Sequence, residues 1–532
     1  MPNRSTDALF QLIKSLEKSE KRNFKLYVRR NSASEDLKII RLFDALDKMT
    51  EYDEGLLLQK NKNIKKQQLS NQKASLYRQI LASLRLLKNE NNVDIQLHEQ
   101  LDHARILYNK GLYLQSLKML DRIKESARQY EQHSFLLEVL FFEQKIEALH
   151  ITRSMQDRAE RLAQEVTEVN QRLNCIGQLS NLSLQLYSWY IRHGVARNEK
   201  DEKAIREFFE RQLPADLTFC EGFYEKLFLF QSFTWYAFIR QDFLLYYRYT
   251  QKWVDLFDRR QEMISVETSH YIKGLHNLLG AHFDLLNFPK FQETLAHFES
   301  FMESPLVREN DNNRIQSFVY LQIAKLNSHF IEGTFTEGLR LVPPLLEKLR
   351  EMELYIDRHR ILVLYYKIAC LYFGSGDYER TIVYLSQIIN WKVNLRTDLQ
   401  CYSRLLHLIA HYELGNEQLL EYLIKSVYRF MAKMENLSLV EEEIFRFLRI
   451  SFQVSARQLQ PEFGKLLEKL KQYEKNRFET RAFVYLDVIS WLESKIRRVP
   501  VQEIIREKFL LRAGETRSAS PRHPAPGTHV KY

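Results

Sequence analysis

Two sets of histidines are the residues of this sequence whose type and spacing could support metal chemistry. His407 and His411 stand four residues apart, so on one helix they share a face and could share a metal ion. The metalloprotease form of this pair needs a glutamate directly after the first histidine, and Leu408 occupies that place. A second set consists of His270, His276 and His282, which are six residues apart. Each step of six residues corresponds to about 120° around a helix. We expect packing or surface histidines in both sets, with no metal, cofactor or catalytic residue.

Aromatic side chains could grip a partner, and they are densest between residues 219 and 258, where 15 of 40 residues are Phe, Tyr or Trp. The first half of this segment is apolar nearly all round, which is typical of a helix sandwiched between neighbours, whereas the second half has one aromatic stripe. A groove for a peptide or flat ligand is one interpretation, because Tyr and Trp combine an apolar body with a polar tip. Core packing is the other. The groove interpretation would use Tyr224, Phe228, Trp235, Tyr246 and Trp253.

Basic residues concentrate at the start of the chain, where residues 1–95 hold 19 Lys and Arg against 12 Asp and Glu. Such a surface could neutralise phosphates, which makes nucleic-acid binding a possible function of this segment. A solvated face with snorkelling lysines is the alternative. The residues that we would assign to an anion site are Lys62, Lys65, Lys66 and Lys73.

Other catalytic signals are weak. Glu441, Glu442 and Glu443 open a helix, where negative charge favours the positive end of the helix dipole. The stretch Gly374-Ser-Gly-Asp377 is too short for a phosphate loop and lacks its lysine. The sequence therefore favours a protein that binds over one that catalyses.

The elements that must position these residues are helical hairpins. The chain is rich in leucine and poor in Gly (15) and Pro (11), which favours an all-helical protein. Residues that break or cap a helix recur every 39 to 48 positions, a period typical of a solenoid of stacked hairpins. We expect one tight turn at each of nine positions: Gly111, Ser154, Gly194, Asp242, Asn287, Gly333, Gly376, Gly415 and Gln460.

Two of these units resemble the tetratricopeptide repeat. In the segment 368–385, Ala369 matches the small residue of the family's first helix, and Gly376-Asp377-Tyr378 matches its turn. The segment 104–123 aligns in the same way, with Ser116 at the position that Thr381 occupies in the other unit. The opening residues 18–27 are also similar to the start of bacterial proteins that carry such repeats. The resemblance implies a right-handed superhelical solenoid of hairpins, here longer than the family's, that binds a protein or peptide on its concave face.

Three segments follow from these patterns. Residues 1–95 form a basic helical segment, with helices expected near 6–29, 35–49 and 68–89; residues 96–511 form the repeat region; and residues 512–532 form a disordered basic tail. Four widely spaced cysteines and the absence of an apolar leader favour a reducing, cytoplasmic location without a transmembrane segment.

The function that we expect is a non-catalytic interaction scaffold, with a protein or peptide partner held on the concave face. The alternative is a regulator whose basic N-terminal segment binds nucleic acid while the repeats sense a ligand or protein.

Overall fold

The computed structural model describes residues 7–519 except for short gaps at 32–35, 61–65, 88–91, 151–156, 218–220, 353–354, 392–395, 435–436, 452, 454–455 and 480–486. All regular elements in the described part of the chain are helices, which confirms the all-α prediction. The chain divides into two compact units, Met1–Thr167 and Glu168–Tyr532. The division falls within one long helix, α9 (Arg158–His193), and not at residue 95.

The first unit begins with five helices around one apolar core. Leu9, Ile13, Phe43, Leu76 and Ile80 are among its buried members. Three more helices follow before α9. The helices of this unit are α1 Ala8–Ser15, α2 Lys18–Asn31, α3 Asp36–Lys48, α4 Glu54–Lys60, α5 Lys66–Leu87, α6 Val93–Asn109, α7 Tyr113–Gln129 and α8 His133–Leu149.

The helix expected over residues 6–29 is two helices, so that prediction was wrong. Leu16 adopts an extended backbone and ends α1. The amide of Glu17 donates to the Glu20 carboxylate at 2.9 Å, which caps the start of α2. The break lets both helices present an apolar side to the same core, since Ile13 precedes it and Phe24 follows it. Helix α4 is an element that the sequence analysis missed.

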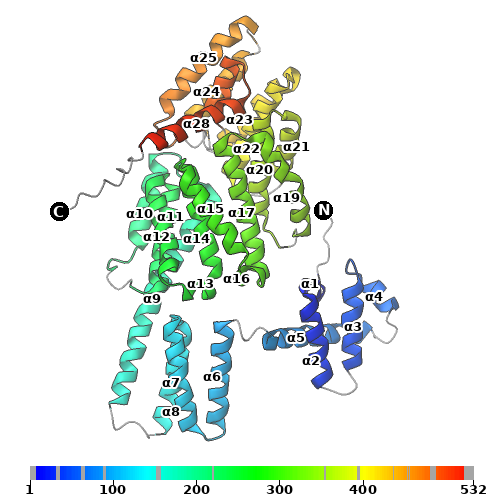
Figure 1. Cartoon of the computed structure of the whole chain (residues 1–532), viewed down its shortest axis with the longest axis vertical. Helices are drawn as coiled ribbons and strands as arrows, with labels where there is room; N and C mark the ends of the chain where they lie inside the picture. Colours follow the sequence, from blue (N-terminus) through cyan, green and yellow to red (C-terminus); the bar gives the residue numbers. More distant parts are fainter. Residues whose placement is uncertain are drawn as a thin grey trace, which may run out of the picture. The chain divides into compact units, whose positions relative to one another are not determined.

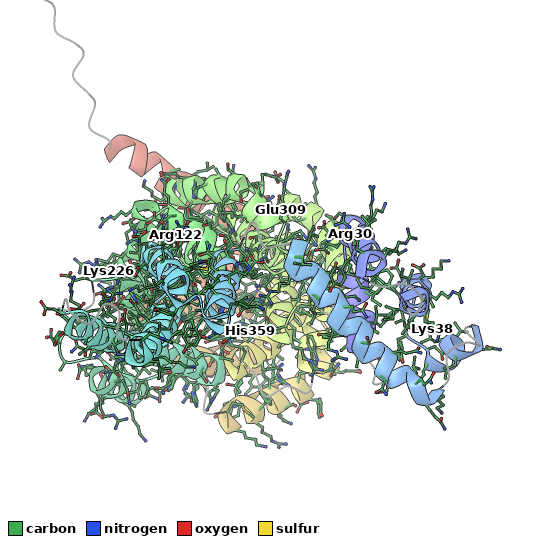
Figure 2. The ribbon with its side chains drawn as sticks, turned by 90° about the horizontal axis from the view of Figure 1, so that it is seen from below. Arg30, Lys38, Arg122, Lys226, Glu309 and His359 are labelled. Atoms are coloured by element: carbon green, nitrogen blue, oxygen red, sulfur yellow. The ribbon has the colours of Figure 1, made fainter. Side chains whose placement is uncertain are left out.

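The second unit is a succession of helices in which each packs mainly on its neighbours in the chain, with α14, α17 and α20 adjacent to one another (Figure 1). Figure 2 draws the side chains, among them the labelled Lys226, Glu309 and His359 of this unit. After α9, its helices are α10 Glu199–Gln212, α11 Phe223–Ile239, α12 Phe243–Arg259, α13 Glu262–Val266, α14 Thr268–Asp284, α15 Phe288–Met302, α16 Pro305–Arg308, α17 Asp311–Glu332, α18 Phe335–Gly338, η2 Leu339–Leu341, α19 Val342–Glu351, α20 Arg358–Ser375, α21 Tyr378–Ile389, α22 Thr397–Glu413, α23 Glu417–Lys433, α24 Leu439–Ser451, α25 Ala456–Tyr473, α27 Val488–Arg497 and α28 Val501–Ala519.

Seven of the nine predicted turns lie between helices, as expected. Five of them use a glycine with positive φ, the left-handed conformation that ends a helix at little steric cost: Gly111, Gly194, Gly333, Gly376 and Gly415. Asp242 and Asn287 instead cap the starts of α12 and α15 through their side chains. Ser154 lies outside the described residues.

Gln460 was wrongly assigned to a turn, because it lies inside α25. Its side-chain amide donates to the carbonyl of Ile496 at 2.8 Å, so this polar residue helps to hold α25 against α27. Pro461, which follows it, is also inside α25 and does not end the helix.

The two hairpins that resemble the tetratricopeptide repeat share one hydrogen bond in the same register. Ser116 Oγ donates to the Ala104 carbonyl at 2.8 Å, twelve residues earlier in the chain. Thr381 Oγ1 makes the equivalent contact with the Ala369 carbonyl at 3.5 Å, again over twelve residues. Both hydroxyls are fully buried, so a small polar residue ties the second helix of each hairpin to the first.

Contacts between distant parts of the second unit depart from the nearest-neighbour stack that the sequence predicted. The Arg197 guanidinium donates to the Met434 carbonyl at 3.4 Å, across 237 residues. The Arg396 amide donates to the Ile191 carbonyl at 3.4 Å. Glu202 forms an ion pair with Arg477. The region around α9 and α10 therefore contacts residues that follow α21, α23 and α25, which a stack with only nearest-neighbour contacts would not allow.

The last helix, α28, also packs against helices far earlier in the chain. Arg506 Nη1 donates to the Glu332 carbonyl at 3.1 Å, and the Phe509 ring lies 4.8 Å from that of Phe288. The predicted tail over 512–532 begins too early, since α28 continues to Ala519 and the first proline comes only at Pro521. Residues 520–532 lie outside the described residues. None of the helices in the described ranges combines the length and apolarity needed to cross a bilayer.

Candidate functional site: a polar cluster on five helices

Polar and aromatic side chains from five helices of the second unit meet along one line of contacts, which we call the five-helix cluster. Its members on α17 and on α20 are seven residues apart, and those on α14 are three and eight residues apart, so on each helix they lie near one face. Most of them keep part of their surface in solvent. The cluster consists of Tyr187 on α9, Trp235 on α11, Lys273, His276 and Asp284 on α14, Tyr320 and Asn327 on α17, and Arg360 and Lys367 on α20.

Contacts between α17 and α20 repeat with a fixed offset of 40 residues. Arg360 Nη2 donates to the Tyr320 hydroxyl at 3.2 Å, and Lys367 Nζ donates to Asn327 Oδ1 at 2.6 Å. The second contact lies seven residues further along both helices than the first. The cluster therefore has two levels, about 10 Å apart at 1.5 Å of helix rise per residue.

Contacts between α14 and α17 follow the same spacing with an offset of 44 residues. Ser269 Oγ donates to Asn313 Oδ1 at 2.8 Å. Seven residues further along each helix, the His276 ring stacks on the Tyr320 ring with centroids 3.9 Å apart and planes 8° apart. Tyr320 is thus held between a histidine from α14 and an arginine from α20, which fixes its ring and its hydroxyl.

Two aromatic rings lie near the ammonium group of each lysine of the cluster. Lys273 Nζ lies 4.5 Å from the ring centre of Tyr187 and 5.3 Å from that of Trp235. Lys367 Nζ lies 5.6 Å from the Phe283 ring and 5.4 Å from the Phe330 ring. Cation–π attraction therefore contributes to the position of both ammonium groups.

Charge is poorly balanced within the cluster. Desolvation, with repulsion from Arg360, lowers the pKa of Lys273 to about 8. Desolvation also lowers the pKa of Lys367 to about 8, although the nearby Asp284 opposes that change. Neither lysine has a carboxylate at ion-pair distance among the described residues, and Arg360 is already paired with Asp357 at 3.0 Å. An added anion would therefore stabilise both ammonium groups.

The same environment shifts the other titratable members of the cluster. Desolvation raises the pKa of the Asp284 carboxyl to about 7, against the attraction of Lys367. Desolvation, with repulsion from Arg360, Lys273 and Lys367, lowers the pKa of His276 to about 3. Burial therefore favours the neutral form of both groups, the uncharged imidazole of His276 and the protonated carboxyl of Asp284.

Three of the five predicted aromatic contacts lie on the face of α11 that meets α14. Trp235 belongs to the five-helix cluster. Tyr224 donates its hydroxyl to Glu267 at 2.8 Å, and Phe228 lies edge-on to the His270 ring with centroids 6.0 Å apart. Tyr224 and Phe228 are half-buried, whereas 6% of Trp235 is exposed.

The structure places the other two predicted contacts, Tyr246 and Trp253, in the apolar core, which favours the packing interpretation for both. Trp253 is fully buried, and Tyr246 is 4% exposed. A Cβ atom on Gly274 would lie 3.2 Å from the Trp253 ring, and one on Gly280 would lie 3.3 Å from the Tyr246 hydroxyl. The two glycines of α14 thus make room for the aromatic stripe of α12. As expected for a sandwiched helix, α11 also contacts rings of α10 and α12, with Tyr236 on Phe209 and Phe233 on Tyr249.

The predicted anion site near the N-terminus is only partly described. Lys62 and Lys65 lie outside the described residues, and Lys66 is exposed at the start of α5. Lys73 forms an ion pair with Asp7 and donates to the Tyr52 hydroxyl at 2.8 Å. Its charge therefore joins α5 to the start of α1, and a phosphate would have to compete with Asp7 for it.

The histidines singled out from the sequence make packing contacts. The His407 and His411 rings lie 4.5 Å apart, and His411 is within hydrogen-bond distance of Asn416. In the part of the chain that the structure describes, no third histidine, cysteine or carboxylate completes a metal site with them. His282 is 1% exposed and lies against Tyr247. His270 and His276 face α11 and α17, so the six-residue set divides between sides of α14, as its spacing indicated.

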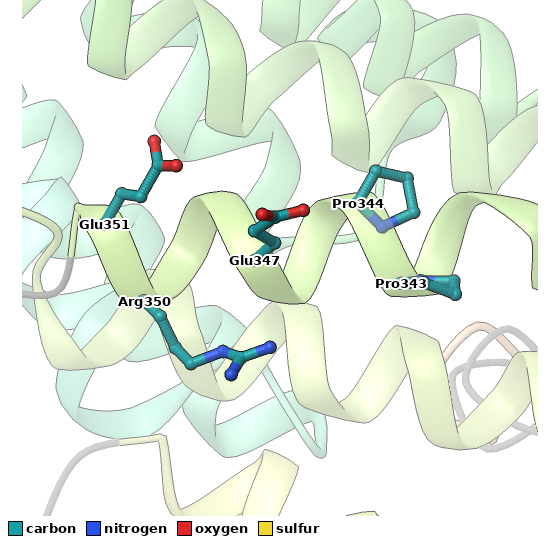
Figure 3. A pocket seen from close by; sticks show the side chains of 5 residues that line it. All are labelled: Pro343, Pro344, Glu347, Arg350 and Glu351. Atoms are coloured by element: carbon teal, nitrogen blue, oxygen red, sulfur yellow. The ribbon is translucent and has the colours of Figure 1, made fainter.

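A surface hollow on α19 offers less chemistry than the five-helix cluster. It is lined by Pro343, Pro344, Glu347, Arg350 and Glu351, all from that one helix. Arg350 and Glu351 extend in opposite directions (Figure 3). A single helix with mixed charges does not converge on a ligand, so we do not assign a function to this hollow.

Comparison of the chain with models of known protein families, with curated proteins and with solved structures gave no significant match. The function must therefore be inferred from the chemistry of the five-helix cluster.

Proposed function

We propose that the protein is a non-catalytic interaction scaffold, in which tetratricopeptide-like hairpins hold a protein or peptide partner along the face formed by α9, α11, α14, α17 and α20. The observation that carries this proposal is the five-helix cluster. Five helices contribute to it, and polar groups with remaining solvent access recur at two levels along it. A partner lying across these helices would contact several hairpins at once, which is how repeat arrays bind extended segments.

Side-chain contacts between the helices support a firm binding surface. The ladder of contacts from α14 through α17 to α20 fixes the side chains of the cluster before a partner arrives. Distant contacts such as that between Arg197 and Met434 further restrain the helices that carry them. Preorganisation of this kind reduces the entropy that binding would otherwise cost.

A library of random 12-residue peptides, selected for binding to the full chain, tests the proposal. Tyr187→Ala and Phe228→Ala each remove a half-buried ring beside the proposed surface. We expect each to weaken the selected peptides at least tenfold, as measured by fluorescence anisotropy. The matched control is Tyr422→Ala on α23, which removes a ring that is 70% exposed. A library without binders, or binders indifferent to both ring variants, would contradict the proposal.

The regulator hypothesis stays a prediction and has its own test. Lys66 and Arg78 are exposed on α5, whereas Lys21 and Lys25 pair with Asp47 and Asp44. Binding to an arbitrary DNA duplex that weakens steeply with salt, and is lost on neutralising Lys62, Lys65 and Lys66, would support it. No binding at low salt would remove it. The cytoplasmic location also stays a prediction.

A further inference from the structure

The five-helix cluster holds more positive charge than it neutralises, and this imbalance restricts what can bind there. Arg360 is paired with Asp357, and the buried Arg396 is paired with Asp398 at 2.9 Å. The remaining cations are Lys273 and Lys367, against the single carboxyl of Asp284. Desolvated ammonium groups without a carboxylate partner are costly to keep charged, so the site favours an anionic ligand.

We propose that the partner segment is acidic, and that its carboxylates bind Lys273 on α14 and Lys367 on α20. This inference depends on the proposed function, since it names the chemistry of the partner at the same surface. Each lysine presents N–H donors between aromatic rings, and a carboxylate is an acceptor that fits such donors.

The aromatic faces of the cluster are already covered by side chains of the protein itself, which favours carboxylates over nucleobases as ligands. Lys273 covers the rings of Tyr187 and Trp235. The Tyr320 ring stacks on His276 and also lies 5.4 Å from the Arg360 guanidinium. Single-stranded nucleic acids bind largely by stacking bases on free aromatic faces. Because these faces contact cations and a histidine of the protein itself, the groups left for a ligand are mainly hydrogen-bond donors.

Helix geometry sets the spacing of the acidic residues. Lys367 lies at the level of Asn327, and Lys273 lies about one turn before His276 and its partner Tyr320. Lys273 is three residues before the level of Tyr320 and Lys367 is seven residues after it, so the two lysines are about 15 Å apart along the helices at 1.5 Å of rise per residue. An extended peptide advances about 3.3 Å per residue, so two acidic residues about four to five positions apart would reach both lysines.

The C-terminal segment of this chain does not fit the site. Residues 512–532 hold 4 Lys and Arg against 1 Glu, so like charges would repel it. The observations thus favour an acidic segment of another protein.

The test uses the full chain and the peptides selected from the random library. We expect enrichment of Asp and Glu in pairs about four to five positions apart. Replacing each such pair by Gln, in a fluorescein-labelled peptide, should weaken binding at least tenfold. Lys273→Gln and Lys367→Gln should each have a similar effect and should make binding less sensitive to salt. The control is Lys425→Gln, which removes a 62% exposed lysine from a surface ion pair on α23. It should change neither the affinity for the peptide nor the salt dependence of binding.

The outcomes separate this inference from the proposed function. Some peptides could bind through Tyr187 and Phe228 and yet be neutral or basic, or bind both lysine variants equally well. Either result would contradict the proposal of an acidic partner but not the proposal of an interaction scaffold. A library without binders would overturn both. Two further probes are a twelve-nucleotide thymidine strand and inorganic phosphate. Binding of either in a lysine-dependent manner, without binding of the acidic peptides, would overturn the inference in favour of a phosphate ligand. Thermal melts show whether each variant is folded.

Discussion

Glu202 on α10 forms an ion pair with Arg477, 275 residues further along the chain. The carboxylate is 2% exposed and also contacts Arg206 and Arg240. Burial opposes ionisation of this carboxyl, but the hydrogen bond from Arg240 and the three positive charges outweigh it, so the pKa of Glu202 is lowered. Glu202 thus joins α10, the end of α11 and the segment after α25.

Removing this charge should destabilise the second unit. We expect Glu202→Gln to lower its free energy of unfolding by about 3 kcal/mol, because three guanidinium groups lose their shared partner. Urea titration at pH 7 measures the change. Glu207→Gln on the same helix, where the glutamate is 66% exposed and pairs with Lys203, is the control and should cost less than about 0.5 kcal/mol. Equal effects of the two variants would contradict the role of Glu202 as the shared ion-pair partner of three arginines.

The pH dependence of Glu202 gives a second measurement on the same variant. Because folding lowers the pKa of this carboxyl from its ordinary value of 4.5, its contribution is present above pH 4.5 and is lost as the pH falls through the lower folded value. The difference in melting temperature between the native chain and Glu202→Gln should therefore shrink under acid conditions.

Two turn glycines should respond differently to alanine. Gly376 has φ +87° with open space around its Cβ position, so Gly376→Ala meets only backbone strain, about 1 kcal/mol. Gly333 has φ +71°, and a Cβ atom there would lie 2.5 Å from the Arg506 amide of α28. We expect Gly333→Ala to cost at least about 1 kcal/mol more, because α28 must also move. Urea midpoints and the rate of tryptic cleavage within α28 measure the two effects. Identical costs would show that α28 does not pack closely on this turn.

Protonation of His276 should destabilise the second unit in acid. Its pKa falls from 6.5 to about 3 on folding, so its contribution is complete above pH 6.5 and decreases as the pH falls towards 3. His276→Phe keeps a ring against Tyr320 without a titratable group. We expect this variant to be more stable than the native chain at pH 4 by about 1–2 kcal/mol, after allowance for its partial exposure. The exposed His103→Phe serves as the control. No gain at pH 4 would contradict the desolvation of His276.

Asp284 should have the opposite pH dependence. Its pKa rises from 3.8 to about 7 on folding, so the stability of the native chain decreases as the pH rises through that range. Asp284→Asn should therefore stabilise the protein by about 1–2 kcal/mol at pH 8 and hardly at all at pH 3.5. The variant should also bind the acidic peptides several-fold more tightly at pH 8, since a nearby negative charge is removed. The control is Asp311→Asn, at a carboxylate that is 48% exposed. An equal gain at both pH values would indicate a packing effect.

Much of the helical framework could be predicted from the sequence. Gly376 and Gly415 mark turns because a glycine with positive φ ends a helix locally, and Asp242 caps a helix with its own side chain. The prediction failed at Leu16, where one helix becomes two, and at Gln460, which continues a helix. Both outcomes depend on packing partners, the core shared by Ile13 and Phe24 in one case and the Ile496 carbonyl in the other.

The candidate site was only partly predictable. The aromatic stripe of α11 was visible as a pattern, and Trp235 does belong to the cluster. Lys273 and Lys367 gave no local signal, because each is the single lysine of its helix and belongs to no motif. The repeat of seven residues within α14, α17 and α20 becomes meaningful only when the offsets of 44 and 40 residues between these helices are known.

The sequence by itself determined that the chain folds into helices and where most of them end, because these properties depend on the conformational preferences of a few neighbouring residues. Only the tertiary structure decided that Glu202 meets Arg477 and that the cations of α14 and α20 lie on one line of contacts. Those relationships depend on how one helix is rotated and shifted against the next. These displacements accumulate over many helices, and no short stretch of sequence specifies their sum.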